Sequence, residues 1–193
     1  MFRQIAIVTL AAASVLPAFS AFAAPFKDMD GNIHIQDVTP NAQVPIEAGE
    51  SKKKVKANYC GLVVVSKPNT STPIPGSIVV GGETIDTTTL PMQSLPACVD
   101  NALKEARATN FKTSDGRVVL VAKTAGINYD VIYTGVPSVK QYRASVCGFV
   151  RISNSLTNPA PASFTYASTP YTTADLPTQT PGRCINGVKF IPQ

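Results

Sequence analysis

Residues 26–33 read FKDMDGNI, and residues 111–118 read FKTSDGRV, with the same residue at four of the eight positions. The match continues between residues 51–66 and residues 138–153, where seven of sixteen positions are identical. The shared Phe-Lys start and the shared Asp-Gly pair indicate that one structural unit occurs twice.

A third match joins residues 73–98 to residues 159–184, with eight of twenty-six positions identical. The three matches are collinear and share 19 of 50 positions, where about three would agree by chance at an ordinary match rate of about 6%. The sequence therefore predicts a tandem duplication, with repeat domains at residues 24–109 and 110–193.

The composition favours short strands joined by turns. The chain has 16 Pro, 12 Gly and no Trp, and β-branched residues and Tyr dominate its apolar segments. We therefore expect a mainly β fold made of two small disulfide-stapled domains. One short helix is expected near residues 96–108, because Pro96 suits a first helical turn and four apolar residues follow at helical spacing: Val99, Ala102, Leu103 and Ala106.

Residues 1–23 have the pattern of a signal peptide. Arg3 precedes an apolar segment that ends in the small-residue site Ala21-Phe22-Ala23. The alternative is a membrane anchor, but the apolar segment is only about 18 residues long and contains Pro17. We expect an exported protein, periplasmic or extracellular, whose mature chain has no transmembrane segment.

The four cysteines occur at equivalent places in the two repeats. In an exported chain an even number of cysteines favours disulfides, and the repeat selects one of three pairings, which joins Cys60 to Cys98 and Cys147 to Cys184. A metal site is the alternative, but it usually needs closely spaced cysteines and histidines. No cofactor is predicted.

Basic residues give the chain a formal net charge of +5, which becomes +4 once Arg3 is removed. This mild charge does not indicate a nucleic-acid partner. Its densest region could bind anions such as lipid headgroups or acidic polysaccharide, or could be a solvated linker. The candidate anion-binding residues are Lys52, Lys53, Lys54, Lys56, Lys140 and Arg143.

Two polar features near the first Asp-Gly pair are interpreted as structural. Asp28 and Asp30 suggest calcium, but only Asp-Gly recurs in the second repeat, so a tight turn is favoured. His34 is the single histidine and alternates as an outward strand residue, with Val119 as its counterpart. We therefore expect Asp28 and His34 to matter little for stability, and we expect no enzyme active site.

Val119 and Val121 occupy the outward positions that His34 and Gln36 hold in the first repeat. Exposed neighbouring valines are unfavourable, so these two residues are predicted to form an interdomain or partner face. The first repeat or the expected helix could cover them, and an external partner is the alternative.

These features predict a non-enzymatic cell-envelope or secreted protein that acts by binding or as a structural or adhesive element. Its partner would be a protein or an anionic envelope component. One alternative is a secreted hydrolase inhibitor that uses the two Pro/Ser/Thr-rich loops, from Lys67 to Pro75 and from Asn154 to Pro161. A surface-fibre subunit is a further alternative.

Overall fold

The computed structural model describes residues 24–192, so the expected signal peptide lies outside the described residues. The mainly β fold is confirmed. The elements in chain order are β1 (Phe26–Lys27), β2 (Ile33–Ile35), β3 (Gln43–Lys56), β4 (Val63–Val65), β5 (Ser77–Val80), β6 (Glu83–Asp86), β7 (Cys98–Val99), β8 (Ala102–Leu103), β9 (Phe111–Lys112), β10 (Val118–Leu120), β11 (Asn128–Arg143), β12 (Val150–Ile152), β13 (Ser163–Tyr166), β14 (Thr169–Thr172), the short 3-10 helix η1 (Thr173–Asp175), β15 (Arg183–Ile185) and β16 (Val188–Phe190).

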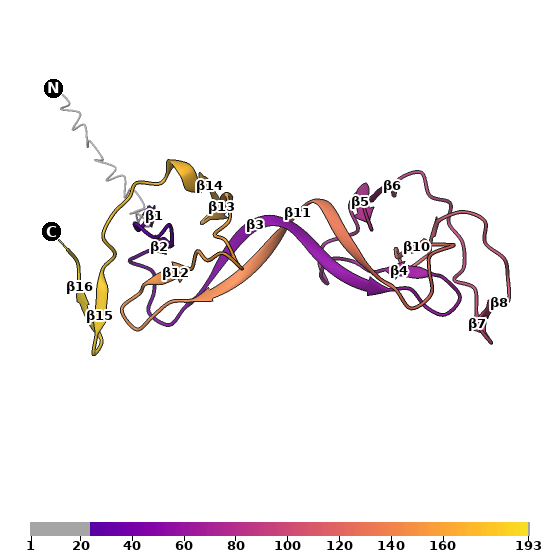
Figure 1. Cartoon of the computed structure of the whole chain (residues 1–193), viewed down its shortest axis with the longest axis horizontal. Coiled ribbons are helices and arrows are strands. Elements are labelled where there is room, and N and C mark those ends of the chain that lie inside the picture. The colour runs from indigo at the N-terminus through magenta and orange to yellow at the C-terminus, as the bar shows by residue number, and fades with distance from the viewer. Residues whose placement is uncertain (1–23, 193) are drawn as a thin grey trace, which may run out of the picture.

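The described chain forms two lobes joined by a long twisted ribbon of β3 and β11 (Figure 1). We call residues 24–49 and 137–192 the terminal lobe, because both ends of the described chain lie there, and residues 50–136 the central lobe. The strand order β14-β13-β3-β11-β5-β6 runs through both lobes. At the middle of the ribbon the register shifts between Tyr133 and Val139, and such bulges increase the local twist.

The core of the terminal lobe combines residues from both ends of the chain. Strand β2 pairs with β12, so that Ile33 lies opposite Ile152 and Ile35 lies opposite Val150. All four side chains are buried, together with Phe164 of β13. The residues of each cross-strand pair are more than 110 positions apart in the sequence, so this core requires a long-range association.

The central lobe uses the complementary segments. Strand β10 pairs with β4, and it is the counterpart of β2 in register and in burial. The core beneath this sheet contains Val63, Ile78 and Leu120, closed by the fully buried Tyr133 of β11. The Tyr133 hydroxyl donates to the Ser66 carbonyl oxygen at 2.7 Å, so its polar atom remains satisfied.

Neither lobe coincides with residues 24–109 or 110–193. Strands β1 and β2 form a sheet with β12 in the terminal lobe, and strands β9 and β10 form a sheet with β4 in the central lobe. We call this arrangement the exchange of strands. The cause is the length of β3, whose 14 residues span roughly 45 Å at about 3.3 Å per residue. This strand carries the chain out of the terminal lobe before residue 57. The boundary expected at residue 109 falls inside the central lobe, between β8 and β9.

The expected helix near residues 96–108 is wrong, because this segment forms the hairpin β7–β8. Asp100 and Asn101 both have positive φ, at 52° and 62°, which is the backbone of a two-residue hairpin turn. Asp and Asn tolerate that conformation better than other non-glycine residues. The turn brings Leu103 opposite Cys98. Four apolar residues at helical spacing were therefore not sufficient to predict a helix here.

Between residues 24 and 192, no helix is long and apolar enough to cross a membrane.

Candidate functional site

Both predicted disulfides are present, Cys60–Cys98 in the central lobe and Cys147–Cys184 in the terminal lobe. Each closes a segment of nearly 40 residues, at separations of 38 and 37. Closing a loop of that length stabilises a domain by about 4 kcal/mol in the chain-entropy account. Each lobe is therefore closed by its own covalent bridge.

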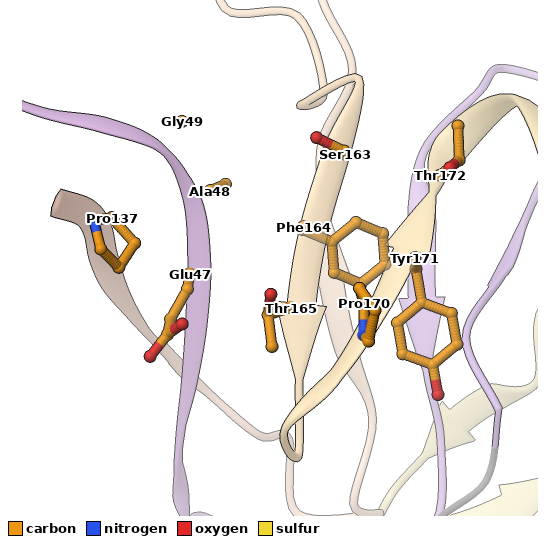
Figure 2. Close-up of a pocket in the computed structure, with 10 residues that line it drawn as sticks. All are labelled: Glu47, Ala48, Gly49, Pro137, Ser163, Phe164, Thr165, Pro170, Tyr171 and Thr172. Carbon is orange, nitrogen blue, oxygen red and sulfur yellow. The ribbon is translucent and has the colours of Figure 1, made fainter. Parts of the chain in front are cut away.

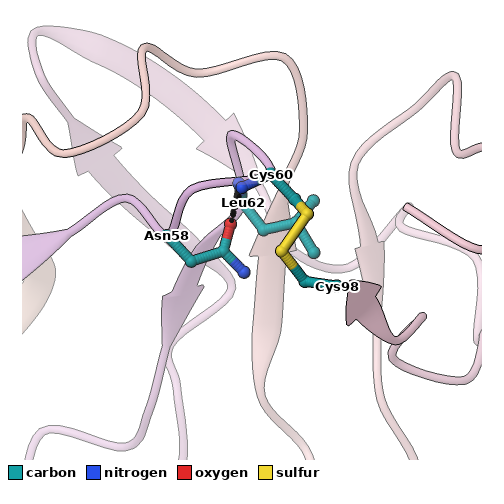
Figure 3. Close-up of a disulfide and its surroundings, with 4 residues drawn as sticks. All are labelled: Asn58, Cys60, Leu62 and Cys98. Atoms are coloured by element: carbon teal, nitrogen blue, oxygen red, sulfur yellow. Dashed lines mark hydrogen bonds between the residues drawn. A yellow bond between two sulfur atoms is a disulfide. The ribbon is translucent and has the colours of Figure 1, made fainter. Parts of the chain in front are cut away.

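A polar side chain orders the turn that carries the first cysteine of each bridge. The Asn58 side-chain oxygen accepts hydrogen bonds from the backbone N–H groups of Cys60 at 3.0 Å and Leu62 at 2.9 Å (Figure 3). In the terminal lobe the Ser145 hydroxyl oxygen accepts from Cys147 and Phe149 at 3.3 and 3.1 Å. Different residue types thus build the same turn.

The glycine after each of these cysteines is required by close packing. Gly61 has φ of +74°, and a Cβ built on it would lie 2.6 Å from the Lys123 carbonyl oxygen. Gly148 has φ of +73°, and its Cβ would overlap the Val38 carbonyl oxygen. Glycine is therefore required in both Cys-Gly pairs, by its positive φ and by the backbone atom that a Cβ would meet.

The candidate anion-binding residues do not form one patch. Lys52, Lys54 and Lys56 alternate along β3 and are exposed. Lys53 points to the other face, where its Nζ donates to the Lys67 carbonyl oxygen at 2.6 Å and lies 6.0 Å from the ring centroid of Tyr133.

Lys140 and Arg143 lie in the other half of the ribbon, opposite Ile46 and Gln43. Of the six candidate anion-binding residues, only the three exposed lysines on the central-lobe half of β3 therefore remain together as a basic surface.

The predicted outward position of His34 is wrong, because the residue is only 9% exposed. Its ring stacks on Phe26, with centroids 5.3 Å apart, and its Nε2–H donates to Asp28 Oδ2 at 2.9 Å. Asp28 also accepts from the Asn32 side chain at 2.8 Å and from the backbone N–H of Asn32 at 2.9 Å. Asp28 thus connects the turn to β2 through hydrogen bonds. The alternation of polar and apolar residues along a strand cannot predict such a contact.

The surroundings of Asp28 favour its charged form. Burial opposes ionisation, but hydrogen bonds from His34 and Asn32 outweigh it and lower the pKa of Asp28 from 3.8 to about 2. Asp115 stands in the second Asp-Gly turn, where hydrogen bonds from Thr113 and Arg117 likewise lower its pKa to about 2. In residues 24–192 no group of three or more His, Cys, Asp or Glu side chains could hold a metal ion.

Val119 is fully buried, and Val121 is half-buried. They belong to a small apolar cluster whose other members include Leu62, Leu103 and Phe111. Leu62 and Leu103 come from the first half of the chain. The contact is made by strands of one lobe, however, so Val119 offers no surface to a partner.

The sequence did not reveal a groove beside the ribbon in the terminal lobe. Strand β13 meets β3 only where Thr165 lies opposite Glu47, so the two strands diverge on either side of this contact. The groove has a volume of about 360 Å³. Figure 2 shows Thr165 on the side of β13 that faces β3, the Glu47 carboxylate directed toward the Pro137 side of β3, and the rings of Phe164 and Tyr171 on the other side of β13. Hydroxyls and one carboxylate at an open groove could hold a polar partner, but no sequence motif marks them.

Comparison with known proteins gave no matching family model, no similar curated protein and no similar solved structure.

Proposed function

We propose that the protein is an exported, non-enzymatic structural or adhesive element of a cell envelope, which holds two binding lobes at a fixed separation. The observation that carries this proposal is the ribbon of β3 and β11 between two disulfide-closed lobes (Figure 1). Disulfides suit an oxidising compartment outside the cytosol. The duplication inferred from the sequence would explain why two lobes of one design occur in a single chain.

The connection between the lobes suits a protein under tension. A force that separates the lobes acts along β3 and β11 together, so two covalent backbones share it. The antiparallel pairing of these strands, with Val131 opposite Lys53 and Tyr142 opposite Val44, keeps the ribbon from separating into two flexible linkers. Unlike a single Gly/Ser linker, such a ribbon keeps a nearly constant span.

Each lobe carries one of the two Pro/Ser/Thr-rich loops, and both are ordered by their own side chains. The Asn69 side-chain oxygen accepts from the backbone N–H groups of Ser71 and Thr72, at 3.0 and 2.7 Å. In the other lobe the Asn154 side-chain oxygen accepts from the Ala160 N–H at 3.0 Å. Ordered loops lose less entropy when they bind, so we assign the partner contacts to them.

The alternatives are less well supported. A fibre subunit would donate its first strand to a neighbouring molecule, but β1 pairs with β2 of its own lobe, with Phe26 opposite His34. An inhibitor needs only one loop to block one target, and gives no role to a second lobe.

Two lobes that both bind predict density-dependent attachment to a surface. Immobilised cell-envelope fragments from the producing organism, at increasing surface density, would be tested with the mature protein and with variants in which residues 67–75 or 154–161 are replaced by Gly-Ser. The intact protein should dissociate at least about tenfold more slowly at high density than at low density, because the second contact becomes intramolecular. Each single replacement should abolish that difference, and the double replacement should abolish binding.

Density-independent dissociation of the intact protein would contradict the proposal. Stoichiometric inhibition of a hydrolase that depends on one loop would favour the inhibitor instead.

A further inference from the structure

Each lobe has one three-stranded sheet, β1-β2-β12 in the terminal lobe and β4-β10-β9 in the central lobe. The face of this sheet opposite the main core is polar in the terminal lobe and apolar in the central lobe. In the terminal lobe one row across the strands consists of Phe26, His34 and Arg151. The corresponding row in the central lobe consists of Phe111, Val119 and Val64 in the same register. Both sheets keep the phenylalanine, and only one replaces its two neighbours with ionisable side chains.

The same replacement continues around these rows. Gln36 follows His34 at the position where Val121 follows Val119. Lys189 lies opposite Cys184, where Leu103 lies opposite Cys98 in the other lobe. The central lobe fills this region with its apolar cluster of Leu62, Phe111 and Val119.

In the terminal lobe this region is a cavity of about 340 Å³. Its polar lining includes His34, Gln36, Ser145 and Arg151, and its apolar lining includes Phe149 and Pro181. Small-molecule sites commonly have such a concave apolar lining with a few polar groups.

The described acids near the cavity already have partners. Asp28 accepts from His34 and Asn32, and Asp37 forms an ion pair with Lys189. Lys189 in turn lies over the ring of Phe149, with its Nζ 5.2 Å from the ring centroid. Arg151 is an exposed residue that also lines the cavity, and among the described residues no ion pair involves it.

Asp28 also decides which atom of His34 a ligand would meet. An ionised carboxylate only accepts hydrogen bonds, so this contact needs a proton on His34 Nε2. In the tautomer with its single proton there, Nδ1 is an acceptor, and no hydrogen bond among the described residues uses it. A ligand that suits the site would place an anionic group on Arg151 and a hydroxyl donor on His34.

We propose that this cavity is a binding site for a small hydroxy-carboxylate. Its carboxylate pairs with the Arg151 guanidinium, its hydroxyl donates to His34 Nδ1, and its apolar portion lies against Phe149 and Pro181. Free hydroxy acids and the sugar acids of envelope polysaccharides share this chemistry. Because the central lobe has Val64 and Val119 at the equivalent positions, one chain binds one ligand.

The test uses the mature protein with ¹⁵N-labelled histidine, because His34 is the single histidine of the chain. Mandelate should shift the Nδ1 resonance and bind with a stoichiometry of one. Phenylacetate lacks the hydroxyl and mandelamide lacks the charge, and each should bind at least about tenfold more weakly, as expected for losing a hydrogen bond to a charged or buried group. Methyl glucuronide serves as the sugar-acid probe. If it binds more tightly than mandelate, the natural ligand is a sugar acid, and if mandelate binds more tightly, the natural ligand is a free hydroxy acid.

Arg151→Gln should weaken mandelate at least about tenfold, because it removes the charge-assisted hydrogen bond. Arg143→Gln is the matched control, since it removes an exposed arginine of the same lobe outside the cavity, and it should leave affinity unchanged. Equal weakening by both variants would mean general charge attraction and would overturn the proposal. So would two ligands per chain, or no binding of mandelate and methyl glucuronide.

Discussion

His34 Nε2 lies 2.9 Å from Asp28 Oδ2, and this contact joins the first turn of the terminal lobe to the strand that follows it. The side chains of His34 and Asp28 are only 11% and 13% exposed. Asp28→Ala would leave the donors of His34 and Asn32 without their acceptor inside the lobe. We expect it to lower the free energy of unfolding by about 1–3 kcal/mol, measured by urea denaturation.

Asp30→Ala is the matched control for this variant. Asp30 stands in the same turn, but its side chain is exposed and makes none of the hydrogen bonds recorded for the described residues. Its loss should change stability by less than about 0.5 kcal/mol. Equal effects of the two substitutions would show that the turn backbone matters, and not the contact with His34.

The low pKa of Asp28 gives stability a defined dependence on pH. Its pKa is about 2 in the folded protein and 3.8 ordinarily, so the folded state favours the charged form. The stabilisation from this group is fully present above pH 4 to 5 and is lost as the pH falls through the folded pKa. The difference in unfolding free energy between the protein and Asp28→Asn should therefore be constant at neutral pH and should shrink below about pH 4. A difference that grows as the pH falls would contradict this prediction.

The exchange of strands predicts which fragments fold. Residues 50–136 contain all the buried members of the central core, including Ala57, Tyr133 and Leu120. We expect this fragment, with its Cys60–Cys98 disulfide, to unfold cooperatively and to show dispersed amide NMR resonances. Residues 24–109 lack β10 and β11 and should not form a cooperative unit. Cooperative unfolding of the second fragment alone would instead support independent repeats.

Two glycines with nearly the same backbone conformation should respond differently to substitution. Gly61 and Gly116 have φ of +74° and +79°, so alanine is strained at both, by roughly 1–2 kcal/mol. Only at Gly61 would the new Cβ meet a backbone atom, the Lys123 carbonyl oxygen at 2.6 Å. Gly61→Ala should therefore lower the free energy of unfolding by about 1–3 kcal/mol more than Gly116→Ala, as overpacking does. Equal midpoints of thermal denaturation for the two variants would show that the backbone near Lys123 shifts at little cost in free energy.

The sequence predicted the features that local patterns determine. Short apolar segments predicted strands, and equivalent cysteines predicted the bridges Cys60–Cys98 and Cys147–Cys184. Alternation identifies which side chains point inward, but it does not identify the neighbouring strand. Ile33 and Val118 were therefore correctly expected to be buried, while their partners Ile152 and Val65 remained unknown.

The ribbon and the site near His34 needed information that local patterns lack. Only parts of β3 and β11 look like strands, because the ribbon is exposed over much of its length and the Lys52–Lys54 segment is polar. His34 alternates as an outward residue, and only the fold shows that Phe26 stacks on it and that Phe149 and Gly182 line a cavity with it.

The exchange of strands also sets an order in which the lobes can form as the chain emerges during synthesis. The central lobe becomes complete once residue 136 has emerged, and most of its contacts are then within reach. Strands β1 and β2 emerge first, but they must wait for β12, whose residues lie more than 110 positions later. Loop-closure entropy makes such long-range pairing slow, and unpaired strand edges invite association with other chains. The terminal lobe is therefore the part of the described chain that is most open to association with other chains while synthesis is still incomplete.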